Sequence, residues 1–211
     1  MSVQQSDLIK ALITEELNDV IHIRNVFNLS FNRSLSLIHR SKRLHKIIDD
    51  SVFIEHMNDV VRAAIVFIHS ALETSLREII RVSLKAKDLD ISYIPLVGLD
   101  EIPNRREKYA LKDLATHRGK TVEQVINESV DQYLRTLSFN NTTDIATSLK
   151  KVQVPSQTVE QYYSNLNDMI QRRHQIVHEG DIKRTGESSL EFEPVDLDKF
   201  LAWSDSAAKF F

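Results

Sequence analysis

Glycine and proline are scarce in this chain, with four of each among 211 residues. Globular proteins average about 7% glycine and about 5% proline. Folds made of strands and tight turns place glycine at many turn positions. The scarcity therefore favours an all-α protein. The lack of cysteine also excludes a disulfide scaffold, a thiolate zinc site and a cysteine nucleophile.

Apolar residues recur at helical spacing through most of the sequence. The pattern predicts helices over residues 7–48 (with a bend near Asn28–Asn32), 52–87, 121–137, 142–152, 159–179 and 196–211, and a short hairpin over 183–189. Pro95, Gly98 and Pro103 interrupt the pattern, so residues 88–120 are expected to form a long, loop-rich insertion between helices. We expect residues 1–211 to form a single helical domain.

Two segments have the sequence of a capping box, in which a threonine and a glutamine three residues later close the start of a helix. They are Thr121–Gln124 and Thr158–Gln161. We therefore expect one helix to begin at each threonine.

The formal net charge is -3, so no general basic field attracts nucleic acid, and RNA binding would need a local patch. Residues 33–46 are locally basic and include Arg40 and Arg43, which form either a solvated helix face or a phosphate-binding patch. No apolar run approaches the ~20 residues that span a bilayer, and the N-terminus does not look like a secretory signal. We expect a cytoplasmic protein without membrane contact.

The helix predicted over 159–179 carries the most informative pattern. With Ile170 at zero and about 100° per residue, its apolar residues fall within about 40° of one line. They are Val159, Tyr163, Leu166, Ile170 and Val177. Arg173 falls about 60° to one side and His178 about 80° to the other, with His174 at the edge of the stripe. An unpaired buried cation costs several kcal/mol, so this seam is expected to open into a wet cleft that binds anions.

Two other interpretations of these residues stay open. Basic residues are common in the last turn of any helix, where they meet unpaired carbonyls and a favourable dipole. The same dipole would let His178 titrate near or slightly above neutrality. His174 and His178 are also spaced as an i,i+4 metal-binding pair, but two ligands do not make a closed site, and no metal or other cofactor is expected.

The segment Arg173–Gly180, with the sequence RHQIVHEG, resembles the Arg-x(4–6)-His signature of HEPN domains, in which a polar residue follows the arginine. Residues 69–80 are similar to the second helix of that family. The helix that begins at Asp196 is similar to the last helix of the family. The RiboL-PSP-HEPN branch, or the related MAE-like group, is the most similar. The resemblance implies an antiparallel helical bundle that dimerises through its motif helices.

The resemblance also implies a function. Many HEPN domains are metal-independent endoribonucleases of toxin–antitoxin, phage-defence or RNA-processing systems, which leave a 2′,3′-cyclic phosphate. Carried over to this sequence, Arg173, His174 and His178 are the catalytic residues. Arg172, Arg40 and Arg43 are expected to contact RNA, and Glu73 to orient Arg173. The implied partners are RNA, a second copy of the chain and an antitoxin protein.

Two positions depart from the family pattern. Gly180 stands where some HEPN toxins carry a tyrosine, which argues against control by modification of that tyrosine. His174 stands where asparagine is common after the arginine. Some HEPN domains are inactive and only bind RNA or proteins, so a non-catalytic binding module is the alternative interpretation. A third interpretation is a helical interaction domain in which Arg173 and His178 are only helix-end residues.

Overall fold

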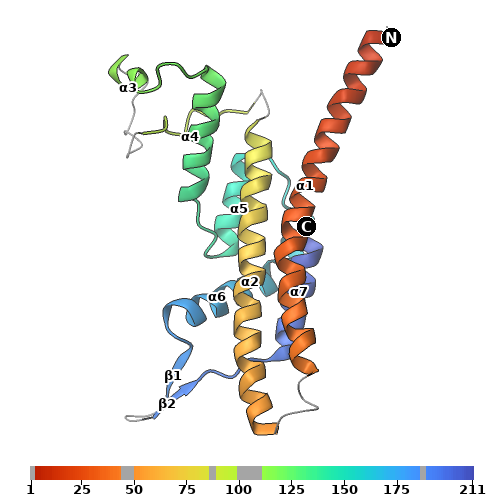
Figure 1. Ribbon diagram of the computed structural model, residues 1–211, viewed down its shortest axis with the longest axis vertical. Coiled ribbons are helices and arrows are strands. Elements are labelled where there is room, and N and C mark those ends of the chain that lie inside the picture. The colour runs from red at the N-terminus through yellow and green to blue at the C-terminus, as the bar shows by residue number, and fades with distance from the viewer. Residues whose placement is uncertain (1–2, 44–49, 86–88, 99–110, 186–188) are drawn as a thin grey trace.

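The computed structural model describes residues 3–43, 50–85, 89–98, 111–185 and 189–211, and they form an all-α fold with one small β-hairpin (Figure 1). The elements are α1 (Val3–Lys42), α2 (Asp50–Leu84), α3 (Leu111–Ala115), α4 (Val122–Thr136), α5 (Thr142–Lys151), the 3-10 turn η2 (Glu160–Tyr162), α6 (Tyr163–His178), β1 (Ile182–Thr185), β2 (Ser189–Phe192) and α7 (Leu197–Phe210). Residues 99–110 of the predicted insertion and residues 186–188 of the predicted hairpin lie outside the described residues. Within the described ranges, no helix combines the length and apolarity needed to cross a membrane.

Helix α2 forms the centre of the bundle. Its buried residues recur every three or four positions. Seven of them have no exposed surface: Ala64, Ile65, Ile68, Ala71, Leu72, Ser75 and Leu76. Helix α1 runs antiparallel along one side of α2, while α4 and α5 lie on the other side (Figure 1). Helices α6 and α7 pack against each other and against α2. The expected antiparallel helical bundle is confirmed.

Helix α1 continues without a break through Asn28–Asn32, so these weak helix formers do not interrupt it. Phe27 and Phe31 stack at 4.9 Å within the core, and this packing outweighs the weak helix propensity of asparagine and serine. The N-terminal half of α1 extends beyond the bundle (Figure 1). There Leu17 and Val20 are 56% and 61% exposed.

The two predicted capping boxes have different outcomes. At α4 the box is present: the Thr121 hydroxyl accepts from the Gln124 amide at 3.2 Å, and the Gln124 side chain accepts from the Thr121 amide at 2.8 Å. At Thr158 the prediction is wrong. The Ser156 carbonyl already accepts from the amides of Val159 and Glu160, so the chain turns early and α6 begins only at Tyr163, after the 3-10 turn.

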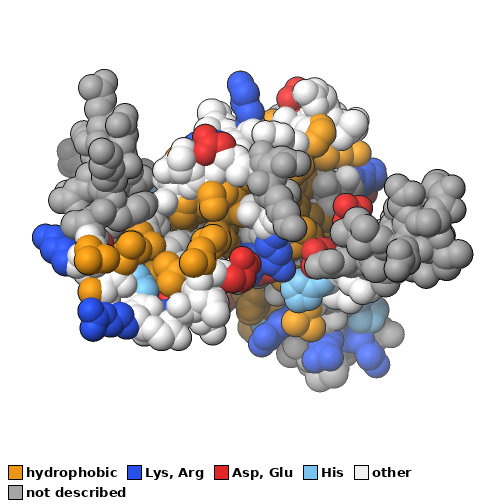
Figure 2. All heavy atoms as spheres, turned by 90° about the horizontal axis from the view of Figure 1, so that it is seen from above, with side chains coloured by type: hydrophobic (Ala, Val, Ile, Leu, Met, Phe, Trp, Pro, Cys, Tyr) orange, Lys and Arg blue, Asp and Glu red, His pale blue; other side chains and the backbone are white. Residues whose placement is uncertain are grey.

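Residues 89–98, the first of two described parts of the insertion, pack against α4. The amide of Val97 donates to the Ser129 hydroxyl at 2.9 Å, and the rings of Tyr93 and Tyr133 lie 5.7 Å apart, edge to face. A hollow of about 710 Å³ lies between this segment, α4 and the end of α2. Seen from above, this end of the molecule shows a band of hydrophobic side chains with scattered charged ones (Figure 2). The hollow is not lined by the motif residues of α6.

Candidate functional site

The buried face of α6 is made by Leu166, Met169 and Ile170. Its centre lies about 50° from the line predicted from the sequence, on the side toward Arg173, at about 100° per residue. Val177, which the sequence places in the apolar stripe, is 46% exposed. The rotation turns Arg173 toward the core and His174 and His178 toward solvent, so one α6 helix does not bring the predicted catalytic residues to a single face.

His174 and His178 form a pair on the exposed side of α6. Their ring centroids lie 4.6 Å apart, and the rings are tilted by 42°. Both residues are exposed, as is Val177 beside them. Two imidazoles so placed can exchange protons with a bound molecule without first being uncovered.

Arg173 lies on a different side of α6 and faces α2. It is half-buried, and its Nε atom is buried without a hydrogen-bond partner among the described residues. On α2 the facing group is His69, which is 1% exposed. Burial lowers the pKa of His69, and the nearby Arg173 guanidinium lowers it further, while Glu73 opposes the shift.

Glu73 lies between His69 and Arg77 on α2. Its carboxylate is 4.0 Å from the Nδ1 atom of His69 and 3.7 Å from the Nη2 atom of Arg77. The carboxylate thus pairs with the Arg77 guanidinium and lies beside the His69 imidazole, and among the described residues no ion pair joins it to Arg173. The orienting role of Glu73 toward Arg173 stays a prediction.

The lowered pKa of His69 predicts that stability falls in mild acid. The folded state keeps this imidazole neutral, whereas the unfolded chain takes up a proton near pH 6.5. As the pH falls below that value the unfolded state binds more protons, so the free energy of unfolding decreases until the lower, folded-state pKa is reached. Urea midpoints at pH 7.5 and pH 5.5 measure the effect. The loss should be smaller in His69→Gln, and unchanged in His22→Gln, which removes an exposed imidazole on α1. Equal losses in all three proteins would contradict the prediction.

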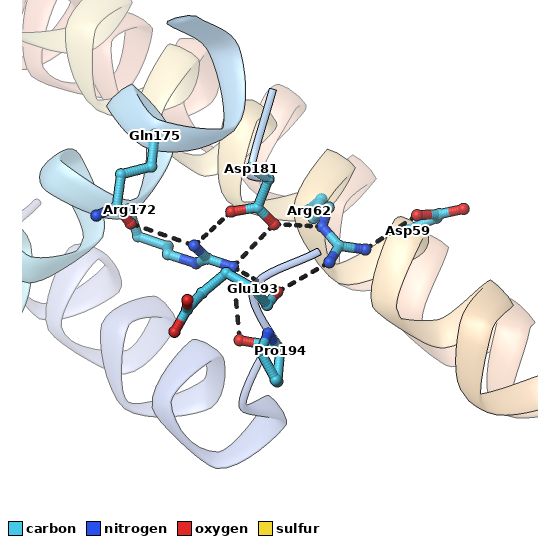
Figure 3. Close-up of polar contacts among 7 residues, drawn as sticks. All are labelled: Asp59, Arg62, Arg172, Gln175, Asp181, Glu193 and Pro194. Atoms are coloured by element: carbon cyan, nitrogen blue, oxygen red, sulfur yellow. Dashed lines mark hydrogen bonds and ion pairs between the residues drawn. The ribbon is translucent and has the colours of Figure 1, made fainter. Parts of the chain in front are cut away.

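Arg172 belongs to a buried ion cluster that the sequence did not predict (Figure 3). The Asp181 carboxylate, whose side chain is 4% exposed, lies between Arg62 of α2 and Arg172 of α6. It accepts from the Nε atom of Arg62 at 2.5 Å and from the Nη2 atom of Arg172 at 2.9 Å. Both guanidinium groups also donate to the Glu193 carbonyl at 2.9 Å. We call Arg62, Arg172 and Asp181 the arginine clamp.

The clamp fixes the chain directly after the motif. Gly180 and Asp181 both have positive φ angles, of 65° and 57°, which is uncommon for aspartate. The amide of Asp181 donates to the Gln175 carbonyl at 3.2 Å, and its carbonyl accepts from the Glu193 amide at 2.9 Å. These bonds hold the sharp turn from α6 into β1. The Arg172 side chain is only 11% exposed, which favours a structural role over the RNA contact predicted from the sequence.

The other predicted RNA-binding residues lie apart from α6. Arg40 and Arg43 are exposed at the end of α1, and within the described residues α1 makes no contact with α6. Among all the residues that the structure describes, no three histidine, aspartate or glutamate side chains are grouped so that they could hold a metal ion.

The sequence pattern missed Arg62, Asp181 and His69. Arg62 is 119 residues from Asp181, and no local spacing connects them. Asp181 did carry a signal, because it follows Gly180 at the end of a helix, where a turn and a polar contact are expected.

Comparison with known proteins gives one finding. Residues 29–210 match the family model described as RiboL-PSP-HEPN. No curated protein and no solved structure matches the chain. The family match begins within α1, so the projecting half of that helix lies before it.

Proposed function

The chain belongs to the RiboL-PSP-HEPN family, and from that premise we propose that it is a metal-independent endoribonuclease. The observation that carries the proposal is the pair of exposed imidazoles, 4.6 Å apart, in the last turns of the motif helix. RNA contains its own nucleophile, the 2′-hydroxyl, already close to the neighbouring phosphorus. The protein therefore needs only to move protons and to stabilise negative charge.

The proposed reaction is a transesterification within the RNA. The 2′-oxygen forms a bond to phosphorus and the bond to the 5′-oxygen breaks, which leaves a 2′,3′-cyclic phosphate and a 5′-hydroxyl. His178 accepts the 2′ proton or donates one to the leaving 5′-oxygen. Arg173 stabilises the charge on the phosphate oxygens, and His174 orients the phosphate. Arg40 and Arg43 contact the RNA backbone away from the scissile phosphate.

We propose that two copies of the chain share the site. Arg173 and His178 point to different sides of one α6, so a single copy does not offer both to one phosphate. Exposed Val177, next to both histidines, gives the motif helix an apolar contact for a second copy. The whole chain then acts as one domain of a cytoplasmic homodimer, in a toxin or phage-defence system with an antitoxin as a further partner.

One observation favours a second candidate, a non-catalytic module that binds RNA or protein. Arg173 faces buried His69, as a residue with a structural role would. This candidate predicts RNA binding that weakens with salt but no cyclic-phosphate product.

The test is cleavage of an end-labelled single-stranded RNA by the full chain in EDTA. We expect fragments with a 2′,3′-cyclic phosphate, and no cut where the nucleotide before the scissile bond is 2′-deoxy. His22→Ala, an exposed histidine on α1, controls for loss of an imidazole. Cleavage that survives the 2′-deoxy substitution, or no cleavage of any RNA tested, contradicts the proposal.

A further inference from the structure

Phe192, the last residue of β2, is a large aromatic side chain that is 66% exposed. It pairs across the hairpin with Ile182 of β1, which is 47% exposed. Single exposed apolar residues are common on protein surfaces. Phe192 differs from those because its ring rests on a buried, fixed cation.

The cation is Arg62. Its guanidinium carbon lies 5.1 Å from the centroid of the Phe192 ring, within the range of a cation–π contact. The Arg62 side chain is 12% exposed and is held by the Asp181 carboxylate and the Glu193 carbonyl (Figure 3). The arginine clamp therefore supports one side of the ring, and the ring's large exposure leaves the rest open to a ligand.

The hairpin that carries the ring directly follows the motif helix. β1 begins four residues after His178, and the hairpin continues directly from the end of α6 (Figure 1). The turn between them is fixed by the backbone bonds of Asp181. The same clamp thus fixes the end of the motif helix and the platform under Phe192.

We infer that Phe192 is a stacking platform for an unpaired RNA base next to the scissile phosphate, an inference that rests on the proposed function. Every base has a π-face, and proteins that bind single strands stack bases on aromatic side chains near cationic groups. The substrate class would then be single-stranded RNA.

A second copy of the chain is a weaker candidate for this ring. A stable interface buries about 800 Å² on each partner. The exposed apolar side chains of the hairpin are Phe192 and Ile182 among the residues whose side chains are described, and an aromatic ring supplies only about 150–250 Å². The hairpin is therefore better suited to one base than to the centre of a protein interface.

The experiment compares Phe192→Ala, Phe192→Leu and Phe192→Trp with Leu29→Ala, which truncates a 78% exposed residue on α1. We expect the RNA concentration at half-maximal cleavage to rise by about 5- to 150-fold for alanine. Leucine should resemble alanine, because it restores apolar area but no ring. Tryptophan and Leu29→Ala should resemble the original chain, and the rate at saturating RNA should change little throughout.

Abasic substitutions, placed one at a time along a short RNA, give the second measurement. At one position the abasic RNA should bind the original chain as weakly as Phe192→Ala binds intact RNA, with no further loss when both changes are combined. Binding by fluorescence anisotropy needs no cleavage, so it tests Phe192 even if the ribonuclease proposal fails.

Two results would overturn the inference. One is an unchanged RNA affinity in Phe192→Ala. The other is a loss of affinity accompanied by a halved mass in sedimentation, which would make the ring a contact between copies of the chain.

Discussion

Replacing His178 with alanine is expected to slow RNA cleavage by about 10²- to 10⁴-fold, the usual contribution of a positioned general acid or base. The imidazole is exposed, so its removal creates no cavity and leaves no buried partner unpaired. The melting temperature should therefore stay within about 2 °C of the original, because surface changes of this kind alter stability by less than about 0.5 kcal/mol. Single-turnover rates at saturating RNA measure the effect.

The matched control for this variant is His22→Ala, which should cleave at the original rate. His174→Ala should lose less activity than His178→Ala, since we assign His174 to phosphate orientation. Full activity in His178→Ala would remove the basis of the proposed mechanism. If His178→Ala loses both activity and folding, His178→Gln separates the two effects. Glutamine keeps a polar side chain but transfers no proton at neutral pH, so a folded but inactive His178→Gln would support the proposed role.

A mixing experiment then tests whether two copies share the site. Arg173→Ala and His178→Ala are each expected to be inactive. A heterodimer of the two retains one site with both residues if Arg173 comes from one copy and His178 from the other. After co-refolding of equal amounts, roughly half of the dimers are heterodimers with one intact site of two, so activity should return toward about a quarter of the original. Sites built within one copy would stay inactive.

The second large effect is expected on stability, from Asp181→Ala. This change leaves Arg62 and Arg172 with buried guanidinium groups, 12% and 11% exposed in their side chains, and no carboxylate between them. Removing one partner from a buried ion cluster costs about 3–5 kcal/mol. Urea denaturation should show a midpoint lowered accordingly at an unchanged slope.

Asp59→Ala is the internal control for Asp181→Ala. Asp59 pairs with Arg62 at 3.0 Å, but the Asp59 side chain is 78% exposed. Ion pairs exposed in this way contribute about 0–1 kcal/mol. Asp181→Asn should fall between the two, because it keeps an acceptor oxygen but loses the charge. Equal losses in Asp59→Ala and Asp181→Ala would show that the clamp contributes no more than a surface pair.

The sequence predicted the helices well because their apolar spacing and end residues are local signals. Thr121 and Asp196 cap α4 and α7 as expected. The capping box at Thr158 was wrong, and the weak helix formers at Asn28–Asn32 do not interrupt α1, for the same reason: a neighbouring contact outweighed a local preference. In α1 that contact is the packing of Phe27 and Phe31, and before α6 it is the early turn at Ser156.

The site was predictable only in part. Periodicity found that cationic side chains cluster at the end of α6, but it placed the apolar stripe about 50° from the observed buried face, at about 100° per residue. Which side of a helix is buried depends on its neighbours, so the inward turn of Arg173 toward His69 needed the position of α2. The clamp was beyond reach, because Arg62 and Asp181 meet only in the folded chain.

The projection of helix α1 beyond the bundle affects local stability along the helix. Its second half is held by the core, whereas Leu17 and Val20 have no such cover. An isolated helical segment of this size is marginal in water, so the cost of local opening should decline along one continuous helix, from nearly that of global unfolding at Phe31 to almost nothing at Glu16. Proteases should cut first in the projecting N-terminal half of α1, and its backbone amides should exchange with deuterium first. A cut there would leave the family-matched residues 29–210 intact.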